Sequence, residues 1–597
     1  MNIFHHRFTQ PSIWLLVLIC FFTFFWRLGS VPLFDLDEGL YVSCSRQMVL
    51  SGDYITPRLN THQSAPPYTS PTPFFEKPIM VYWLSAGAQR LLGVTEWAAR
   101  LPVALLSLFT TLLVAYMGAC WFGRRAGFLA GVLYAIAPMT IADSRQMTTD
   151  AILVFWFLLT FFAFTRLMGI GKIPELSSKQ RWGYVALFWF GIASALLTKG
   201  AVAILLPGLI ISIFLGMTTN GQGIKKWRQV WHRLNSLKIV FGVTFLFLLA
   251  APWHLAIAQH AERDMDGRTF IQEYVIRQHI GRFRGGDKVH NAPPYTYIGY
   301  FLMGFFPWGS FAPVAFRRRL PTEVQDPQEA DSHLFLLIWF WTIFVFFTLS
   351  AAKLPTYIVP IYPAAALLLG RWFNCSLEGG ADRALLGGTF LAVFVTVGMR
   401  VLVERSPRFA RPGNPIPIDI LTLGRHATDI LMVGSILACF CLLWLKRTHH
   451  ARRLGIAIMA VTMFLFTGLF VTEGYAFLGR DVLGPYQRLA QRANTLAGQG
   501  TPVVYYQVDP RRPSMLYYAT YAPYERKQRP LSPLLLPLLL QNPKTGVLVI
   551  TKESEYNKHL LAEIGGQAEL NMKLVAHDGV GQEGWVLAHI TLKNGRL

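Results

Sequence analysis

Residues 11–29 read PSIWLLVLICFFTFFWRLG, and residues 30–41 continue as SVPLFDLDEGLY. The first stretch is apolar and close to the roughly 20 residues that a helix needs to cross a bilayer. Because it ends without the small residues of a signal-peptide cleavage site, we expect an uncleaved membrane span. The second stretch places three carboxylates, Asp35, Asp37 and Glu38, directly after that span. Asp35 lies before the helix expected at 37–51, so we expect it to face headgroups or solvent.

Apolar stretches of this kind recur along the chain. Of its 597 residues, 53% are hydrophobic and only 15% are charged, against roughly 25% charged residues in soluble domains. The sequence therefore predicts a polytopic α-helical membrane protein with about thirteen transmembrane helices. The expected spans are 11–29, 98–121, 124–142, 149–167, 182–198, 200–217, 238–259, 296–316, 333–350, 354–371, 384–403, 427–446 and 453–473.

The charges of the connections predict an orientation. Short basic connections, such as 225–238 and 446–453, are typical of the cytoplasmic side. With this assignment the N-terminus is cytoplasmic, and the acidic stretch at 35–41 faces outward, away from cytosolic nucleotides. The net charge of +22 lies mostly between spans, which indicates topology signals and contact with anionic membrane lipid rather than nucleic acid.

The spacing of the spans predicts two domains. Residues 1–473 form the transmembrane domain, with external loops 30–97 and 260–295, and the first loop contains two interfacial helices at 37–51 and 77–92. Residues 474–597 form a soluble α/β domain on the external side. Strands are expected at 503–507, 546–551, 573–577 and 585–590, and helices at 484–497 and 556–565. No glycine-rich nucleotide-binding motif accompanies these strands.

Polar residues of the predicted membrane domain gather on its external side. Ionisable residues at membrane depth are costly and usually face a cavity or one another, so a shared polar cavity is expected there. Some have simpler explanations: Asp37, Glu38 or Asp150 could cap a helix, and Lys353 could reach the headgroups. The set comprises Asp37, Glu38, Tyr41, Glu76, Lys77, Asp143, Asp150, Lys199, His254, His260, His279, Arg282, His290, Lys353 and Tyr357.

Eight motifs occur in a fixed order between about residues 12 and 370. They are DEGLYVSCSRQMVLSGDYITPRLN, FEKPIMVYW, TTDAILVFW, LTKGAVAILLP, PWHLAIAQ, HIGRF, HNAPPYTYIGYFLMGFFPW and AAKLPTYIVP. In these motifs the chain resembles the polyprenyl-phosphate-dependent lipid A glycosyltransferases that add 4-amino-4-deoxy-L-arabinose. That family lies in the GT-C superfamily, which also holds the protein O-mannosyltransferases.

The resemblance implies an activity and a location. The donor is a sugar on a polyprenyl phosphate, the acceptor is lipid A or another outer-leaflet molecule, and no nucleotide is used. The enzyme works as a monomer in the bacterial inner membrane, with its active site and C-terminal domain in the periplasm.

The resemblance also assigns roles to single residues. Asp37 carries the reaction, with Glu38 beside it, and Asp150 lines the cavity. Lys77 and Arg282 bind the donor phosphate, together with Tyr41, Lys353 and Tyr357. Glu76 and His279 can hold a divalent metal ion, which would be zinc, magnesium or manganese.

Three features depart from the family pattern: a Pro/Ser-rich insertion at 61–73, Arg277 before the QHIGRF motif, and a poorly matching C-terminal third. The chemistry is consistent with the roles above. Negative charge grows on the departing phosphate, where fixed cations stabilise it, while a carboxylate can take the proton of an acceptor hydroxyl. We expect one displacement with inversion.

Two other functions fit the same residues. A flippase or transporter of anionic lipid also needs external cations, but it should show symmetric halves. A protein O-mannosyltransferase-like enzyme would differ in having a peptide acceptor.

Overall fold

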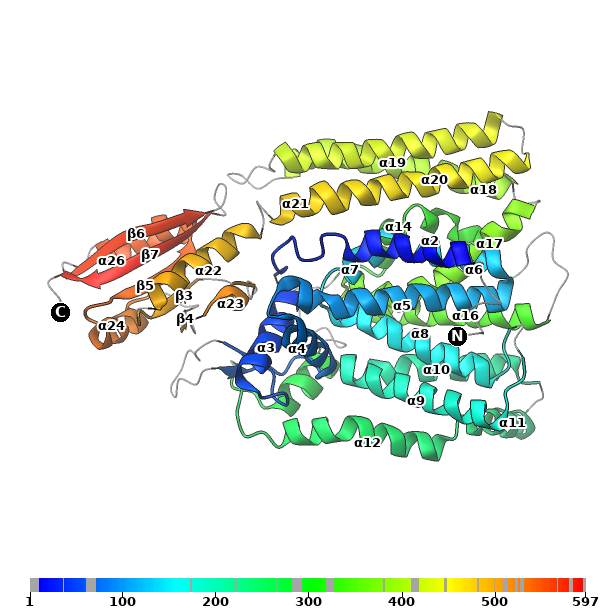
Figure 1. Cartoon of the computed structure of the whole chain (residues 1–597), viewed down its shortest axis with the longest axis horizontal. Helices are drawn as coiled ribbons and strands as arrows, with labels where there is room; N and C mark the ends of the chain where they lie inside the picture. Colours follow the sequence, from blue (N-terminus) through cyan, green and yellow to red (C-terminus); the bar gives the residue numbers. More distant parts are fainter. Residues whose placement is uncertain are drawn as a thin grey trace.

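The computed structural model shows a long helical bundle with a small mixed domain at one end (Figure 1). The structure describes residues 10–35, 37–60, 71–171, 174–220, 223–264, 266–281, 292–317, 327–378, 382–409, 418–444, 448–479, 483–498, 500–507, 514–520, 524–526, 531–565, 567, 569–578 and 584–593.

Eight helices of the described part are long and apolar enough to cross a membrane, which confirms that the chain is a multi-pass membrane protein. They run side by side along the bundle (Figure 1). These helices are α5 (Glu96–Phe122), α8 (Thr149–Leu167), α9 (Ser178–Lys199), α12 (Ile239–Ala258), α16 (Pro327–Leu349), α18 (Asp382–Arg405), α19 (Ile418–Trp444) and α20 (His449–Leu469), the last continuing through α21 (Tyr475–Phe477).

The remaining predicted spans are broken or short. α6 (Arg124–Ala135) and α7 (Pro138–Ser144) form a pair bent by 64°, and α14 (Thr296–Gly304) meets the segment 308–315 at 115°. Proline lies at both breaks, where it removes an N–H donor and interrupts the helix. Length and composition therefore support eight to ten spans, and the predicted count of thirteen is not confirmed.

Three predicted spans differ in a further way. α2 (Gln10–Cys20) and α10 (Val202–Thr218) are apolar but shorter than the others. The segment predicted at 354–371 begins as a 3₁₀ turn (Pro355–Ile361) and becomes α17 (Tyr362–Glu378). Most residues of α17 are buried, so its apolar character reflects the core of the bundle rather than contact with lipid.

Two short helices lie at the end of the bundle that faces the C-terminal domain (Figure 1). α3 (Asp37–Ser51) and α4 (Met80–Leu92) match the two helices predicted in loop 30–97. Between them the antiparallel strands β1 (Arg58–Leu59) and β2 (Thr72–Pro73) close the loop. The inserted residues 61–70 lie outside the described part of the chain.

The C-terminal domain is built on a five-stranded mixed sheet in the order β4-β3-β5-β7-β6. Its strands are β3 (Val503–Tyr506), β4 (Tyr524–Arg526), β5 (Val547–Lys552), β6 (Leu570–Asp578) and β7 (Trp585–Leu592). β3 pairs in parallel with β4 and β5, and β7 pairs antiparallel with β5 and β6. All four predicted strands are present, and β4 was missed.

Helices accompany this sheet. α22 (Gly484–Ala497) was predicted with its observed bounds, and the predicted helix 556–565 is a π-helical turn (Tyr556–Leu560) followed by α26 (Leu561–Gly565). The sequence did not predict α23 (Ser514–Tyr518), α24 (Ser532–Gln541) or α25 (Glu553–Glu555). The last span reaches Phe477, four residues beyond the predicted domain boundary at 473.

Candidate active site

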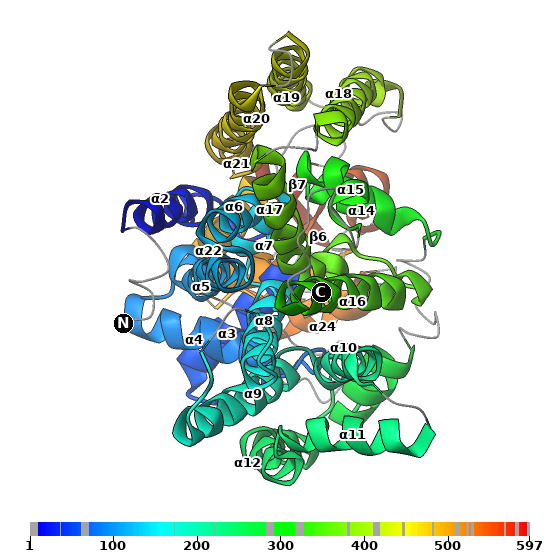
Figure 2. The same cartoon turned by 90° about the vertical axis from the view of Figure 1, so that its right-hand side faces the viewer.

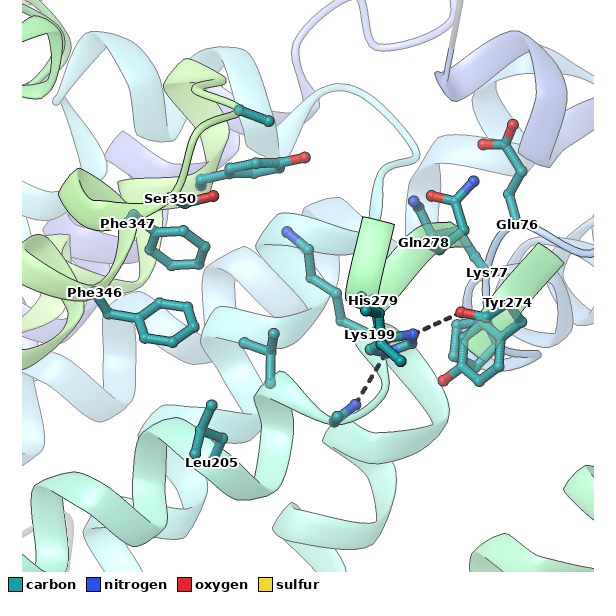
Figure 3. A pocket seen from close by; sticks show the side chains of 16 residues that line it. Glu76, Lys77, Lys199, Leu205, Tyr274, Gln278, His279, Phe346, Phe347 and Ser350 are labelled. Carbon is teal, nitrogen blue, oxygen red and sulfur yellow. Dashed lines mark hydrogen bonds between the residues drawn. The ribbon is translucent and has the colours of Figure 1, made fainter. Parts of the chain in front are cut away.

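A cavity of about 420 Å³ lies between the segment that precedes α4, the junction of α9 and α10, the end of α16 and the helix Ile271–Gly281. Figure 3 shows its lining, with Phe346, Phe347 and Leu205 on one side and Glu76, Gln278 and Tyr274 on the other. The cavity is lined by Glu76, Lys77, Pro78, Lys199, Ala201, Val202, Leu205, Tyr274, Gln278, His279, Ile280, Phe346, Phe347, Ser350, Ala352 and Tyr357.

This lining brings together four of the predicted site residues. Glu76, Lys77, His279 and Tyr357 come from three separate loops of the sequence and share one cavity. Lys77 follows β2 and precedes α4, so the short β pair and the helix start fix its backbone. The cavity combines ionisable groups with an apolar wall, as expected for a site that takes a charged headgroup and a hydrocarbon chain.

Lys199 forms the electrostatic centre of the cavity. Its ammonium group donates to the carboxylate of Asp150 and lies 4.8 Å from the ring centroid of Tyr357, in cation–π contact. The side chains of Lys199 and Asp150 are only 14% and 6% exposed, so each is the main charge partner of the other in a water-poor setting. Asp150 therefore acts on the cavity through Lys199, and it does not itself line the cavity.

Asp143 lies close to this pair and interacts electrostatically with both of its members. Its Oδ1 accepts a hydrogen bond of 2.9 Å from the Thr148 hydroxyl. Its Oδ2 is buried without a hydrogen-bond partner in the described part of the chain. The carboxylates of Asp143 and Asp150 thus lie close to the ammonium group of Lys199, which itself lines the cavity.

Asp37 occupies the first turn of α3, and its side chain is exposed. Like Glu76, it contributes negative charge at the buried hydroxyl of Tyr82. Burial raises the pKa of Tyr82 well above its ordinary value, and the charges of Cys44, Glu76 and Asp37 raise it further. Asp37 does not line the cavity, but Asp37 and the cavity residue Glu76 both lie within electrostatic range of Tyr82.

Glu38 is fully buried in a network of hydrogen bonds. Its two oxygens accept from the Arg100 guanidinium at 2.7 and 2.8 Å, from the Phe34 amide at 2.8 Å and from the Met147 amide at 3.0 Å. Neither Glu38 nor Arg100 has an exposed side chain. These contacts give Glu38 a structural role, and its predicted catalytic role gains no support from them.

Asp35 differs from its sequence-based prediction, which placed it against headgroups or solvent. Its Oδ1 accepts hydrogen bonds from the hydroxyl and the amide of Ser514, the first residue of α23. The C-terminal domain therefore contacts the acidic stretch directly, and that prediction is wrong. Nearby, Tyr518 donates to Glu96 at 3.0 Å and accepts from the Leu33 amide at 2.9 Å.

His279 has hydrogen bonds at both ring nitrogens. Nε2 accepts from the Ala201 amide at 3.2 Å, so the proton resides on Nδ1, which donates to the Tyr274 carbonyl at 2.7 Å. Gly200 has φ +74°, and a Cβ there would lie 2.4 Å from the imidazole, so glycine is needed for this approach.

A divalent metal does not fit these residues as they lie. The described residues contain no group of three His, Cys, Asp or Glu side chains placed to hold a metal ion. His279 shares the cavity with Glu76, but its nitrogens are already used. The predicted metal site at Glu76 and His279 stays a prediction.

The other predicted residues lie apart from the cavity or outside the described part. Lys353 is buried, donates to the Ser350 carbonyl and does not line the cavity. Tyr41 is buried and packs edge-on against Tyr82, with 5.8 Å between ring centroids. Arg282 and His290 lie outside the described residues.

Arg277, which departs from the family pattern, takes part in a local network of hydrogen bonds. Arg277 donates to Glu273 at 2.7 Å, one helical turn away, and Gln278 donates to the same oxygen at 2.6 Å. Burial alone would raise the pKa of Glu273, but the hydrogen bonds from Gln278 and Arg277 hold it below its ordinary value. This charged network fixes the loop helix that carries His279.

The chain is similar to known membrane glycosyltransferases in sequence and in fold. A family model described as dolichyl-phosphate-mannose-protein mannosyltransferase matches residues 76–255. An undecaprenyl phosphate-alpha-4-amino-4-deoxy-L-arabinose arabinosyl transferase of Pectobacterium atrosepticum is 28% identical over 392 residues, which cover 64% of each chain. The protein of the same name from Pseudomonas aeruginosa is 28% identical over 428 residues, covering 70% of this chain and 71% of its own.

Solved structures share the fold over nearly the whole chain. The crystal structure of ArnT from Cupriavidus metallidurans bound to undecaprenyl phosphate has a TM-score of 0.72 at 22% identity, covering 97% of this chain and 98% of that one. An Archaeoglobus fulgidus oligosaccharyltransferase tethered with an acceptor peptide has a TM-score of 0.51 at 13% identity, covering 92% and 69%. The fold is therefore that of the GT-C membrane glycosyltransferases.

The sequence relatives point to one branch. They are named as arabinosyl transferases that act with undecaprenyl phosphate-alpha-4-amino-4-deoxy-L-arabinose, and the chain is similar to them at 28% identity. The alignments with the first curated relatives span about 64% of their length.

Proposed function

We propose that this protein transfers 4-amino-4-deoxy-L-arabinose, or a similar sugar, from a polyprenyl phosphate to lipid A or another outer-leaflet acceptor. The curated relatives are named as transferases of that sugar from undecaprenyl phosphate. The reaction takes place at the periplasmic face of the bacterial inner membrane, with the enzyme as a monomer.

The observation that carries the proposal is the composition of the cavity. Lys77 and Lys199 line the cavity together with other polar residues, and Phe346, Phe347 and Leu205 form an apolar part of its wall. A phosphate on a long isoprenoid chain matches both parts, because its headgroup is anionic and its tail is hydrocarbon. The ArnT structure bound to undecaprenyl phosphate has the same fold.

We assign different residues to the donor and to the acceptor. At the donor end, Lys77 stabilises the charge that grows on the departing phosphate, since a fixed cation acts strongly where water is scarce. Lys199 contributes to the same field and is held there by Asp150 and Tyr357. Arg282, which lies outside the described residues, is proposed for the donor phosphate as well.

At the acceptor end, Asp37 is the proposed base. Its exposed carboxylate lies in the first turn of α3, and it shares electrostatic range of Tyr82 with Glu76, a residue of the cavity lining. It takes the proton from an acceptor hydroxyl, or orients an acceptor phosphate that is already ionised. The acceptor oxygen attacks the anomeric carbon opposite the leaving phosphate, so a single displacement inverts the configuration.

The test is a transfer assay with the purified protein in detergent or proteoliposomes. Radiolabelled sugar on polyprenyl phosphate is offered with extracted lipid A, and product is counted in the lipid fraction. The matched control is Asp37→Asn. Transfer to lipid A by the wild-type protein alone supports the proposal, and absence of transfer by the wild-type protein contradicts it.

A second candidate function differs only in the acceptor. The family model that matches residues 76–255 is named for a protein mannosyltransferase, so a peptide acceptor is the alternative. Adding periplasmic protein to the same assay separates the two, because label in the protein fraction would favour the peptide acceptor. Movement of intact donor across the bilayer without transfer would favour a flippase.

A further inference from the structure

α11 (Gly223–Asn235) differs from every span described above. It connects α10 to α12 at the end of the bundle opposite the C-terminal domain (Figure 1). Figure 2 looks at that end and shows α11 lying across the bundle, whereas the neighbouring α12 is seen nearly end-on. A helix in this position lies in the plane of the membrane surface.

The sequence of α11 has two exposed faces with different chemistry. Ile224, Trp227 and Trp231 are spaced by three and four residues, so they share one face, and they are 88%, 72% and 63% exposed. Tryptophan is enriched where protein meets the boundary between lipid tails and headgroups. Val230 is buried and attaches the helix to the bundle.

The polar face of α11 is strongly basic. The helix contains Lys225, Lys226, Arg228 and Arg233 but no acidic residue. Lys225 and Arg228 are exposed. A basic amphipathic helix with exposed tryptophans is typical of contact with anionic lipid.

A cleft of about 670 Å³ lies beside this helix. Its lining consists of Thr218, Thr219, Asn220, Arg228, Gln229, Trp231, His232, Arg233 and Asn235, none of them acidic. Arg233 donates through Nη1 to the hydroxyl oxygens of Thr218 and Thr219, at 2.9 and 3.1 Å, which holds its guanidinium at the cleft wall. One carboxylate, Asp331 on α16, lies within electrostatic range of Arg233.

We propose that α11 and this cleft bind the headgroup of an anionic phospholipid in the leaflet opposite the candidate active site. The phosphate lies against Arg228 and Arg233, hydroxyl and amide groups of the lining donate to its oxygens, and the acyl chains run past Trp231. The charge of the lining favours an anionic occupant, because Arg228 and Arg233 line the cleft and none of its lining residues in the described part of the chain is acidic. This site is separate from the donor cavity and does not depend on the proposed transfer reaction.

The first measurement uses the wild-type full-length protein. After delipidation in detergent it is titrated with headgroup-labelled phosphatidylglycerol and, separately, with phosphatidylcholine of the same chain length. We expect clear preference for phosphatidylglycerol that weakens as salt is raised. Equal binding of the two lipids would overturn the proposal without recourse to any variant.

The second measurement tests whether the preference for phosphatidylglycerol depends on the basic residues of α11. Lys225→Gln with Arg228→Gln removes two exposed charges from α11, and each basic side chain near an anionic headgroup contributes about fivefold to affinity. We therefore expect affinity for phosphatidylglycerol to fall about 25-fold, with binding of phosphatidylcholine unchanged. Arg228→Lys should keep most of the affinity.

The matched control is Lys179→Gln with Arg181→Gln, at the start of α9. These two residues are also exposed and basic, but they do not line the cleft. Retained affinity in this control supports a defined site at α11. The proposal is overturned if the control variant loses as much affinity for phosphatidylglycerol as the α11 variant, or if the α11 variant loses none. Either result would mean that the lipid binds through the overall charge of the protein and not at α11.

Discussion

Glu38 and Arg100 form an ion pair in which neither side chain is exposed to solvent, with 2.7 Å between Arg100 Nε and Glu38 Oε1. The same guanidinium donates to the carbonyls of Leu28, Val31 and Pro32. Arg100 therefore fixes the segment between the first apolar helix and α3. Because Asp37 is the first residue of α3, Arg100 also helps to position Asp37.

Removing Arg100 should destabilise the protein strongly. Arg100→Ala leaves the Glu38 carboxylate buried without its counter-charge, which typically costs roughly 3–5 kcal/mol. The thermal unfolding of the variant in detergent should shift clearly downward. Arg90→Ala is the control, because that exposed arginine makes only a hydrogen bond to the Tyr54 hydroxyl among its described contacts.

The companion variant Glu38→Gln distinguishes structure from catalysis. We expect it to lose stability, and to lose activity only in proportion to the folded protein that remains. A stable Glu38→Gln protein whose turnover falls a hundredfold or more would restore the catalytic role predicted from the sequence.

The Lys199–Asp150 pair should behave as a unit. Lys199→Met leaves a buried carboxylate beside Asp143 and should lower both stability and transfer. Adding Asp150→Asn removes that uncompensated charge, so the double variant should regain stability but not transfer activity. Additive losses of stability in a double-mutant cycle would show that the two side chains are not coupled.

Lys77 should determine donor affinity. A hydrogen bond to a charged partner is typically worth roughly 1.5–3 kcal/mol, so Lys77→Ala should weaken binding of polyprenyl phosphate about tenfold or more. Titration of the purified protein with the lipid phosphate measures this, with Arg263→Ala as an exposed control outside the cavity. Unchanged affinity in Lys77→Ala would remove this lysine from the donor site.

The sequence predicted the helices and several residues of the cavity lining, but it did not predict which side chains pair with one another. Long apolar runs identify spans, and the ordered motifs place Glu76, Lys77 and Tyr357 at one face, where the structure brings them together. Lys199 was recognised as a polar residue of this face but received no role. Its position directly after the predicted span 182–198 gave no sign that it pairs with Asp150.

Long-range pairings account for what could not be predicted. Arg100 lies 62 residues from Glu38, and Ser514 lies 479 residues from Asp35. No local periodicity carries such information, because these contacts depend on how helices and domains pack. Strand β4 was missed for a related reason: it is a three-residue edge strand whose only neighbour is β3.

The orientation of the bundle can be tested with reporters. A reporter fused after Leu597 should be active only outside the cytoplasm, and one inserted within 225–238 only inside it, since short basic connections stay cytoplasmic. The reverse pattern would place Asp37 on the cytosolic side and contradict the proposed use of an outer-leaflet donor.

Asp37 provides the sharpest test of the proposed chemistry. Asp37→Asn keeps the shape of the side chain and its ability to cap α3, but it removes the base, and losing a general base typically costs about 10²–10⁴ in rate. We expect transfer to fall by that factor with normal expression and normal donor binding.

Asp35→Asn is the matched control for Asp37→Asn. Asp35 is two residues away, and its described contacts are hydrogen bonds from Ser514, which an amide oxygen can still accept. This variant should keep substantial activity. If Asp37→Asn is as active as Asp35→Asn, the carboxylates of this turn serve only to fix its structure, and the base must be sought at Glu76 in the cavity or at Asp150 beneath it.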